Sequence, residues 1–229
     1  MTLRGSRFHR ARILVTTLAI GTLTLTLSEC SINPATGRPA LTGFTSTADE
    51  ARIGREEYPR IVEAFGGIYN DSASQRYVQR IGESVANQAE SADTTFTFTI
   101  LDSAIVNALS TPGGYVYLTR GLLALANNEA ELAGVLAHEV GHIVARHHAQ
   151  QQSRHTLVSI ALAALAVGVN APLPALQGTQ LIALGYLARF SRDQEFEADK
   201  LGARYMARAG YDPSAMVNNP IPDPSEQRS

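Results

Sequence analysis

The pentapeptide HEVGH at residues 138–142 lies in a proline-free stretch, Ala130 to Gln152, whose apolar residues recur with helical spacing. Four helical residues advance by about 400°, so His138 and His142 project from the same face, one turn apart. Two imidazoles at this separation can bind one zinc ion. Glu139 lies about 100° around the helix, where its carboxylate can take a proton from water beside the metal. The pattern predicts a catalytic zinc site on one long helix.

A catalytic zinc site needs a third protein ligand, and one candidate is His148. Its spacing from His142 is that of metzincin proteases, in which a glycine turns the chain three residues after the second histidine. Ala145 stands at that position instead. If the helix continues to Gln152, His148 is rotated far from His138. We therefore interpret His147 and His148 as surface histidines.

Glu195 is the favoured third ligand. It belongs to the segment SRDQEFEAD at residues 191–199, which is predicted to be helical. Glu195 and Asp199 are four residues apart and point the same way on a helix. One carboxylate can bind the metal while the other accepts a hydrogen bond from a ligating imidazole. Glu197 points to the opposite side and is a poor ligand candidate.

The N-terminus has the pattern of an export signal. Residues 1–29 place a basic stretch before an apolar run from Ile13 to Leu27. This run is shorter than the roughly 20 apolar residues that a membrane-spanning helix needs. Cys30, the only cysteine, follows Leu27-Ser28-Glu29, which is similar to the end of a bacterial lipoprotein signal except for Glu29. We expect an exported chain that is lipid-anchored through Cys30. The mildly acidic remainder gives no reason to expect a nucleic-acid partner.

The rest of the chain reads as one domain with short extensions. Residues 30–48, rich in proline, glycine, threonine and serine, predict an extended tether, residues 49–217 the domain, and residues 218–229 a disordered tail. The predicted elements are helices at 49–65 (interrupted or kinked near Pro59), 72–90, 156–169, 181–189 and 194–209, and strands at 94–101 and 114–119. The apolar stretch 156–169 is too short to cross a bilayer, so it predicts a buried core helix or a membrane-surface segment.

HEVGH followed by SRDQEFEAD resembles the gluzincin peptidases that include the CAAX prenyl protease and the HtpX-like, Oma-type and BepA-type proteases. Three further segments are similar to the exported BepA-like branch: NPATGRPAL at 33–41, GGIYND at 66–71, and VNALSTPGGYVYLTRGLLALANNEAELAGVLAHEVGHIVARH at 106–147. The resemblance implies a mainly helical α+β fold, a zincin-like metalloprotease domain with a small sheet beside the HExxH helix.

The resemblance also implies roles for single residues. One Zn²⁺ per chain would be bound by His138, His142 and Glu195, with Glu139 as general base and acid. Asp199 would hydrogen-bond a ligating histidine. The stretch 107–117 would include an edge strand to which an extended substrate adds by β-pairing. Within it, the candidate substrate-binding residues are Asn107, Pro112, Gly113, Gly114 and Tyr115.

The function implied is that of a zinc-dependent metalloendopeptidase that cleaves unfolded or misassembled envelope proteins. It would act in the bacterial periplasm, anchored to the outer membrane through Cys30. Family members continue well past AGYDPSAM at 209–216, whereas this chain ends at Ser229 after a proline-rich tail. This difference motivates an alternative: a zinc-bound, chaperone-like binding protein with little or no proteolysis.

Overall fold

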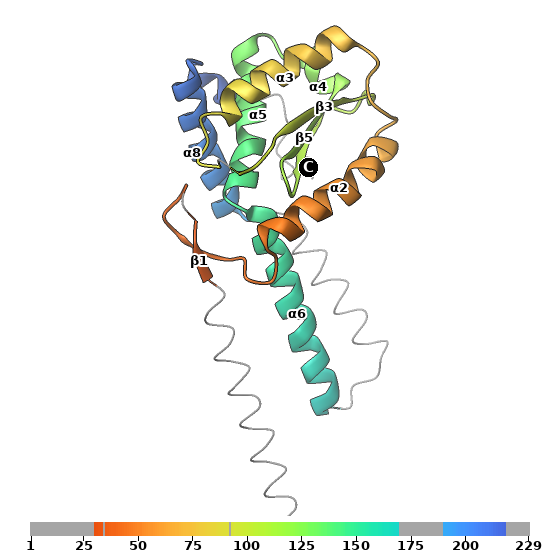
Figure 1. The fold of residues 1–229 in the computed structure, drawn as a ribbon, viewed down its shortest axis with the longest axis vertical. Helices are drawn as coiled ribbons and strands as arrows, with labels where there is room; N and C mark the ends of the chain where they lie inside the picture. The colour runs from red at the N-terminus through yellow and green to blue at the C-terminus, as the bar shows by residue number, and fades with distance from the viewer. Residues whose placement is uncertain (1–29, 34, 92, 170–189, 219–229) are drawn as a thin grey trace, which may run out of the picture.

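The computed structural model describes residues 30–33, 35–91, 93–169 and 190–218 of the chain (Figure 1). The predicted signal peptide, the predicted helix at 181–189 and all but the first residue of the predicted tail lie outside these residues. In chain order the elements are β1 (Cys30–Ile32), β2 (Pro39–Leu41), α2 (Thr47–Ala64), α3 (Ser72–Ala86), β3 (Thr97–Leu101), β4 (Ala108–Thr111), β5 (Tyr115–Thr119), α4 (Arg120–Leu125), α5 (Glu129–Val144), α6 (His147–Val169), α8 (Arg192–Ala209) and the 3-10 helix η2 (Pro213–Asn218).

A three-stranded sheet with the order β3-β5-β4 lies between α2 on one side and α3 and α5 on the other. Strand β5 pairs parallel to β3 and antiparallel to β4, which leaves β4 at an edge. Side chains alternate between the two faces. Tyr115 and Tyr117 contact Tyr58 of α2, with ring centroids 5.4 and 5.9 Å apart. Val116 and Leu118 of β5 belong to the hydrophobic core on the other face.

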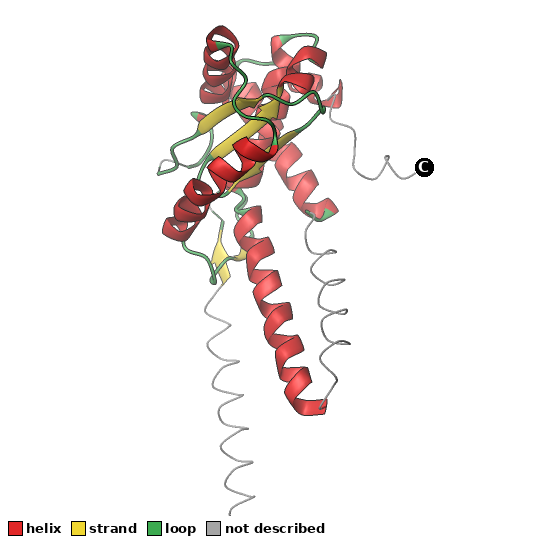
Figure 2. Cartoon of the chain, turned by 90° about the vertical axis from the view of Figure 1, so that its right-hand side faces the viewer, coloured by secondary structure: helices red, strands yellow, loops and turns green. Residues whose placement is uncertain are grey.

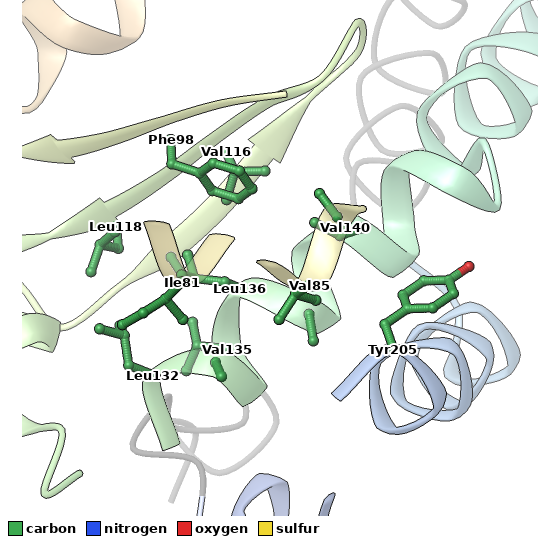
Figure 3. Close-up of a cluster of buried hydrophobic side chains, with 14 of the residues drawn as sticks. Ile81, Val85, Phe98, Val116, Leu118, Leu132, Val135, Leu136, Val140 and Tyr205 are labelled. Carbon is green, nitrogen blue, oxygen red and sulfur yellow. The ribbon is translucent and has the colours of Figure 1, made fainter. Parts of the chain in front are cut away.

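The core lies where α3, α5, α8 and the sheet meet, and Figure 3 shows part of it. Its members come from every one of these elements: Ile81, Val85, Phe98, Val116, Leu118, Leu132, Val135, Leu136, Val140 and Tyr205. Burial of this apolar surface is what holds α5 against the sheet. The mainly helical α+β fold with a small sheet beside the HEVGH helix is therefore confirmed.

Helix α5 begins at Glu129 and ends at Val144, so the prediction of one helix reaching Gln152 is wrong. Arg146 adopts a left-handed backbone conformation, with φ of 57°, and α6 starts directly after it. Such a conformation is uncommon for a residue with a side chain. Here the Arg146 guanidinium donates to the Glu50 carboxylate at 3.0 Å and to the Thr45 carbonyl at 2.7 Å. These bonds hold the break in the helix.

Other boundaries differ less from the sequence prediction. Helix α2 runs through Pro59 without interruption, and α3 ends at Ala86, four residues before its predicted end. Both strands predicted from periodicity are present as β3 and β5. Strand β4 has no comparable alternation of residue types and was implied only by the family resemblance.

Helix α6 projects away from the sheet and the other helices (Figure 2). It contains the predicted apolar helix at 156–169. The described side chains at 156–161 are half-buried or exposed, and Ile160 is 55% exposed, so a buried core helix is the wrong alternative for this part. Among the helices that the structure describes, none is both long and apolar enough to cross a membrane.

The segment predicted as a tether folds onto the domain instead of extending from it. Strands β1 and β2 pair antiparallel, and Asn33 between them is 3% exposed. The Asn33 amide donates to the carbonyl of Val144 at 2.8 Å, which satisfies one of the free carbonyls at the end of α5. Arg204 of α8 donates to the Ala35 carbonyl at 3.0 Å. These polar contacts join the segment to both helices of the candidate site.

Candidate metal centre and active site

Two glycines allow α5 and α8 to lie against each other. A Cβ atom on Gly141 would lie 2.8 Å from the carbonyl oxygen of Ala198 in α8. A Cβ atom on Gly202 of α8 would lie 3.1 Å from the backbone carbon of Ala137 in α5. Larger side chains at these positions would separate the helix backbones. The close approach places the carboxylates of α8 beside the histidines of α5.

The structure brings His138, His142 and Glu195 together, as the sequence predicted. The Nε2 atoms of the two histidines are 2.9 Å apart. The Glu195 Oε2 atom lies 3.3 Å from His138 Nε2 and 3.6 Å from His142 Nε2. Within the part of the chain that the structure describes, these three residues form the one group of histidine, cysteine or acidic side chains arranged to hold a metal ion.

The chemistry and spacing of this donor set fit zinc. At ordinary Zn–N and Zn–O lengths of about 2.0–2.2 Å, two ligands of a tetrahedral site lie about 3.3 Å apart. The two distances to Glu195 lie at this value or slightly above it, and the two nitrogens need to separate by a few tenths of an ångström. Two imidazoles and one carboxylate also leave a fourth position open, as catalytic zinc sites do.

Asp199 holds the ring of His138. The carboxylate Oδ1 lies 2.8 Å from His138 Nδ1, so this nitrogen carries a hydrogen and Nε2 is the ring atom left to bind a metal. Burial alone lowers the pKa of His138, but the hydrogen bonds with Asp199 and Glu195 outweigh it and raise the pKa to about 10. The carboxylates therefore make this position strongly attractive to a positive charge.

Glu195 and Glu139 complete the predicted set. Burial raises the pKa of Glu195, but hydrogen bonds with His138 and His142 outweigh it, so the pKa lies well below its usual range. The carboxylate is thus ionised and able to bind a cation. Glu139, on α5 next to His138, is 7% exposed. Its negative charge contributes to the raised pKa of His138.

His147 was predicted to lie on the surface, and this prediction is wrong: the residue is fully buried. Its Nδ1 atom lies 2.9 Å from Nδ1 of His142, and its Nε2 atom lies 3.2 Å from Oε2 of Glu197. The physical reason is the break at Arg146, which turns the chain back so that His147 faces the HEVGH helix. Burial, followed by the neighbouring His142, lowers the pKa of His147 to about 3, so the ring is neutral.

His148 is half-buried rather than on the surface, and its Nε2 atom lies 3.3 Å from the hydroxyl of Ser110 in β4. It is not part of the metal-binding group. Phe190, which the sequence reasoning did not single out, stacks on the His142 ring with centroids 4.1 Å apart. The one sequence signal for Phe190 was its position two residues before α8, the helix that carries Glu195.

The candidate substrate-binding residues lie around the edge strand. Asn107 precedes β4, and its backbone pairs with Thr119. Gly113 and Gly114 have positive φ angles of 82° and 98° in the turn from β4 to β5. A Cβ on Gly113 would meet the backbone of α2, and the Tyr115 ring packs at a tilt against the Tyr58 ring. Packing against α2 accounts for Gly113 and Tyr115 without a substrate.

Pro112 lies at the mouth of a cavity of about 260 Å³ at the end of β4. The cavity is also lined by His148, Glu50 and Glu57 and is therefore polar in part. Burial raises the pKa of the Glu50 and Glu57 carboxyl groups. Among the predicted substrate-binding residues, Pro112 is the one that lines this cavity.

The model of peptidase family M48 matches residues 72–219, from the start of α3 to the end of η2. The chain belongs to peptidase family M48. The prediction of a gluzincin metallopeptidase relative is thereby confirmed. The matched region contains the helices that carry His138, His142 and Glu195.

The chain is similar to proteins of bacteria and mitochondria. A putative beta-barrel assembly-enhancing protease of Vibrio cholerae is 33% identical over 182 residues, which is 76% of this chain and 38% of that protein. The beta-barrel assembly-enhancing protease of Escherichia coli is 31% identical over 75% of this chain and 38% of its own length. The mitochondrial metalloendopeptidase OMA1 of Schizosaccharomyces pombe is 31% identical over 72% of this chain and 49% of its own. The chain thus spans less than half the length of these relatives.

Proposed function

We propose that this M48 protein is a zinc-dependent metalloendopeptidase that cleaves unfolded or misassembled proteins of the bacterial envelope. The observation that carries the proposal is the convergence of His138, His142 and Glu195 between α5 and α8, with Glu139 next to His138 on α5. The names of the beta-barrel assembly-enhancing relatives support the substrate class.

His138, His142 and Glu195 would hold one zinc ion. Bound there, zinc would supply a Lewis acid that polarises the scissile carbonyl and makes water more acidic. The Glu139 carboxylate then takes the proton from the attacking water and returns it to the leaving amine. The Asp199 carboxylate keeps the His138 ring in the tautomer that presents Nε2 to the metal.

Strand β4 would bind the substrate backbone. Among the described strands β4 has a partner on one side only, so its other side would accept an extended peptide by antiparallel pairing. Such pairing recognises the substrate through backbone hydrogen bonds rather than through its side chains, and it requires a segment that is not already folded. This favours unfolded proteins as substrates over folded ones.

We infer that the protein acts on the periplasmic side of the outer membrane, held by a lipid on Cys30. The signal-like residues 1–29 and the position of Cys30 directly after them support this inference. Cell fractionation of a Cys30→Ala variant tests it: release from the membrane fraction is expected, whereas unchanged membrane recovery contradicts the anchor.

Substrate choice can be tested with one outer-membrane protein in two states. The full zinc-loaded chain is expected to cleave the urea-unfolded protein after dilution, and to leave the same protein intact once it is folded in detergent. Gel electrophoresis of both reactions measures the difference. Equal cleavage of the two states would contradict selection by β-pairing. No cleavage of either, with zinc bound, would favour the binding-protein alternative.

A further inference from the structure

We propose that His147 and Glu197 are positioning residues that fix the tautomer and the ring orientation of the ligand His142. The inference rests on the proposed zinc site, since it concerns how one of its ligands is held. The predicted ligands and Asp199 do not explain how the His142 ring is oriented, and His147 and Glu197 supply that orientation.

The His147 ring is fully buried, and both of its nitrogens have a partner. Its Nδ1 atom lies 2.9 Å from Nδ1 of His142. Its Nε2 atom lies 3.2 Å from the carboxylate of Glu197. The ring therefore bridges a predicted metal ligand and an acidic side chain with no solvent in contact with it.

The direction of these two hydrogen bonds follows from the groups involved. An ionised carboxylate only accepts, so His147 Nε2 carries the hydrogen that goes to Glu197. A neutral imidazole has a single N–H, and His147 Nδ1 is therefore an acceptor. The hydrogen between the two rings must then belong to His142 Nδ1. This leaves the lone pair on His142 Nε2, the atom that faces His138 and Glu195.

The opposite arrangement would disable the site. If His147 Nδ1 carried the hydrogen, His142 would hold its own hydrogen on Nε2, between the other two ligand atoms. That tautomer cannot bind a metal through Nε2. Glu197 selects the useful tautomer through the intervening ring, as Asp199 does directly for His138.

Several contacts hold this arrangement in place. Phe190 stacks on the His142 ring at an interplanar angle of 22°. The left-handed Arg146 redirects the chain so that His147 lies beside α5. Arg38, in the segment before α2, has a guanidinium nitrogen 3.9 Å from the Glu197 carboxylate.

Zinc affinity tests the proposal without reference to proteolysis. His147→Phe keeps the ring size but removes both nitrogens, and it is expected to weaken zinc binding by about 10- to 100-fold in a chelator competition assay. His147→Asn can still accept from His142 and should recover part of the loss. His155→Phe is the matched control on α6, because its Nε2 is buried without a hydrogen-bond partner, and should bind zinc like the wild type.

A purely structural role would give a different pattern. It predicts that His147→Phe lowers the unfolding temperature of the metal-free protein while the folded variant binds zinc with wild-type affinity, and this result would overturn the proposal. If the variant does not fold, nitrogen-15 NMR of the wild-type histidine rings decides. The zinc-loaded protein should carry hydrogens on His142 Nδ1 and His147 Nε2. A hydrogen on His147 Nδ1 would contradict the assignment. If the zinc-loaded wild type carries hydrogens on these two nitrogens but does not cleave protein, only the proposed function is contradicted.

Discussion

Glu139→Gln is expected to abolish detectable proteolysis while leaving zinc bound. The amide keeps the size of the carboxylate but cannot take a proton from water. Positioned general bases contribute about 10²- to 10⁴-fold to rate, and here the same residue would also protonate the leaving amine. The loss should therefore lie at the upper end of this range. Cleavage of unfolded casein and zinc content are measured on the same preparation.

Glu129→Gln is the matched control for this experiment. Glu129 lies in the first turn of the same helix, is exposed, and bonds to the hydroxyl of Tyr211 rather than to the site. It should cleave casein at the wild-type rate. Wild-type proteolysis by Glu139→Gln would contradict the mechanism. If wild type and variant both bind zinc and neither cleaves, the binding-protein alternative becomes the better account.

Gly141→Ala is expected to destabilise the protein and weaken zinc binding together. The new methyl group would lie 2.8 Å from the Ala198 carbonyl oxygen and 3.1 Å from the Ala198 Cα, both backbone atoms of α8. Overpacking of this kind costs about 1–3 kcal/mol, which offsets the gain of about 1 kcal/mol in helix propensity. Separation of the helices would also move Glu195 away from His138 and His142. A distortion that costs about 1.4 kcal/mol weakens binding tenfold.

Gly134→Ala provides the comparison on the same helix. Its Cβ would meet Met216 and Met206 side-chain atoms at 3.1 and 3.5 Å, and flexible methionines can move aside. This variant should be as stable as the wild type or up to about 1 kcal/mol more stable, with unchanged zinc affinity. Urea unfolding and chelator competition measure both properties. If Gly141→Ala and Gly134→Ala have the same stability and the same zinc affinity, the helix contact at Gly141 does not set the geometry of the site.

The sequence predicted the parts of the site that depend on local periodicity. His138 and His142 share a face because α5 is a regular helix, and Glu195 and Asp199 share one because α8 is regular. The N-terminal caps of both helices are also local: Asn128 accepts from the backbone of Glu131, and Ser191 forms a capping box with Gln194. These features need no information from distant parts of the chain.

The features that sequence reasoning missed depend on tertiary contacts. Nothing within residues 143–150 signals a helix break, because Arg146 is held in its left-handed conformation by Glu50 and Thr45, about a hundred positions away in the chain. Once the break was missed, His147 was placed on the surface and its contact with His142 could not be foreseen. The folding of residues 30–48 onto α5 likewise depends on a long-range bond, from Asn33 to Val144.

The most direct test of the account is to measure zinc content and casein cleavage on the same full-length preparation before chelation, after chelation and after zinc is restored. We expect one zinc per chain, cleavage that disappears with the metal, and recovery of both when zinc returns. His142→Ala should neither retain zinc nor cleave. Cleavage that persists in the metal-free chain, or in His142→Ala, would contradict the assignment of a zinc peptidase site to α5 and α8.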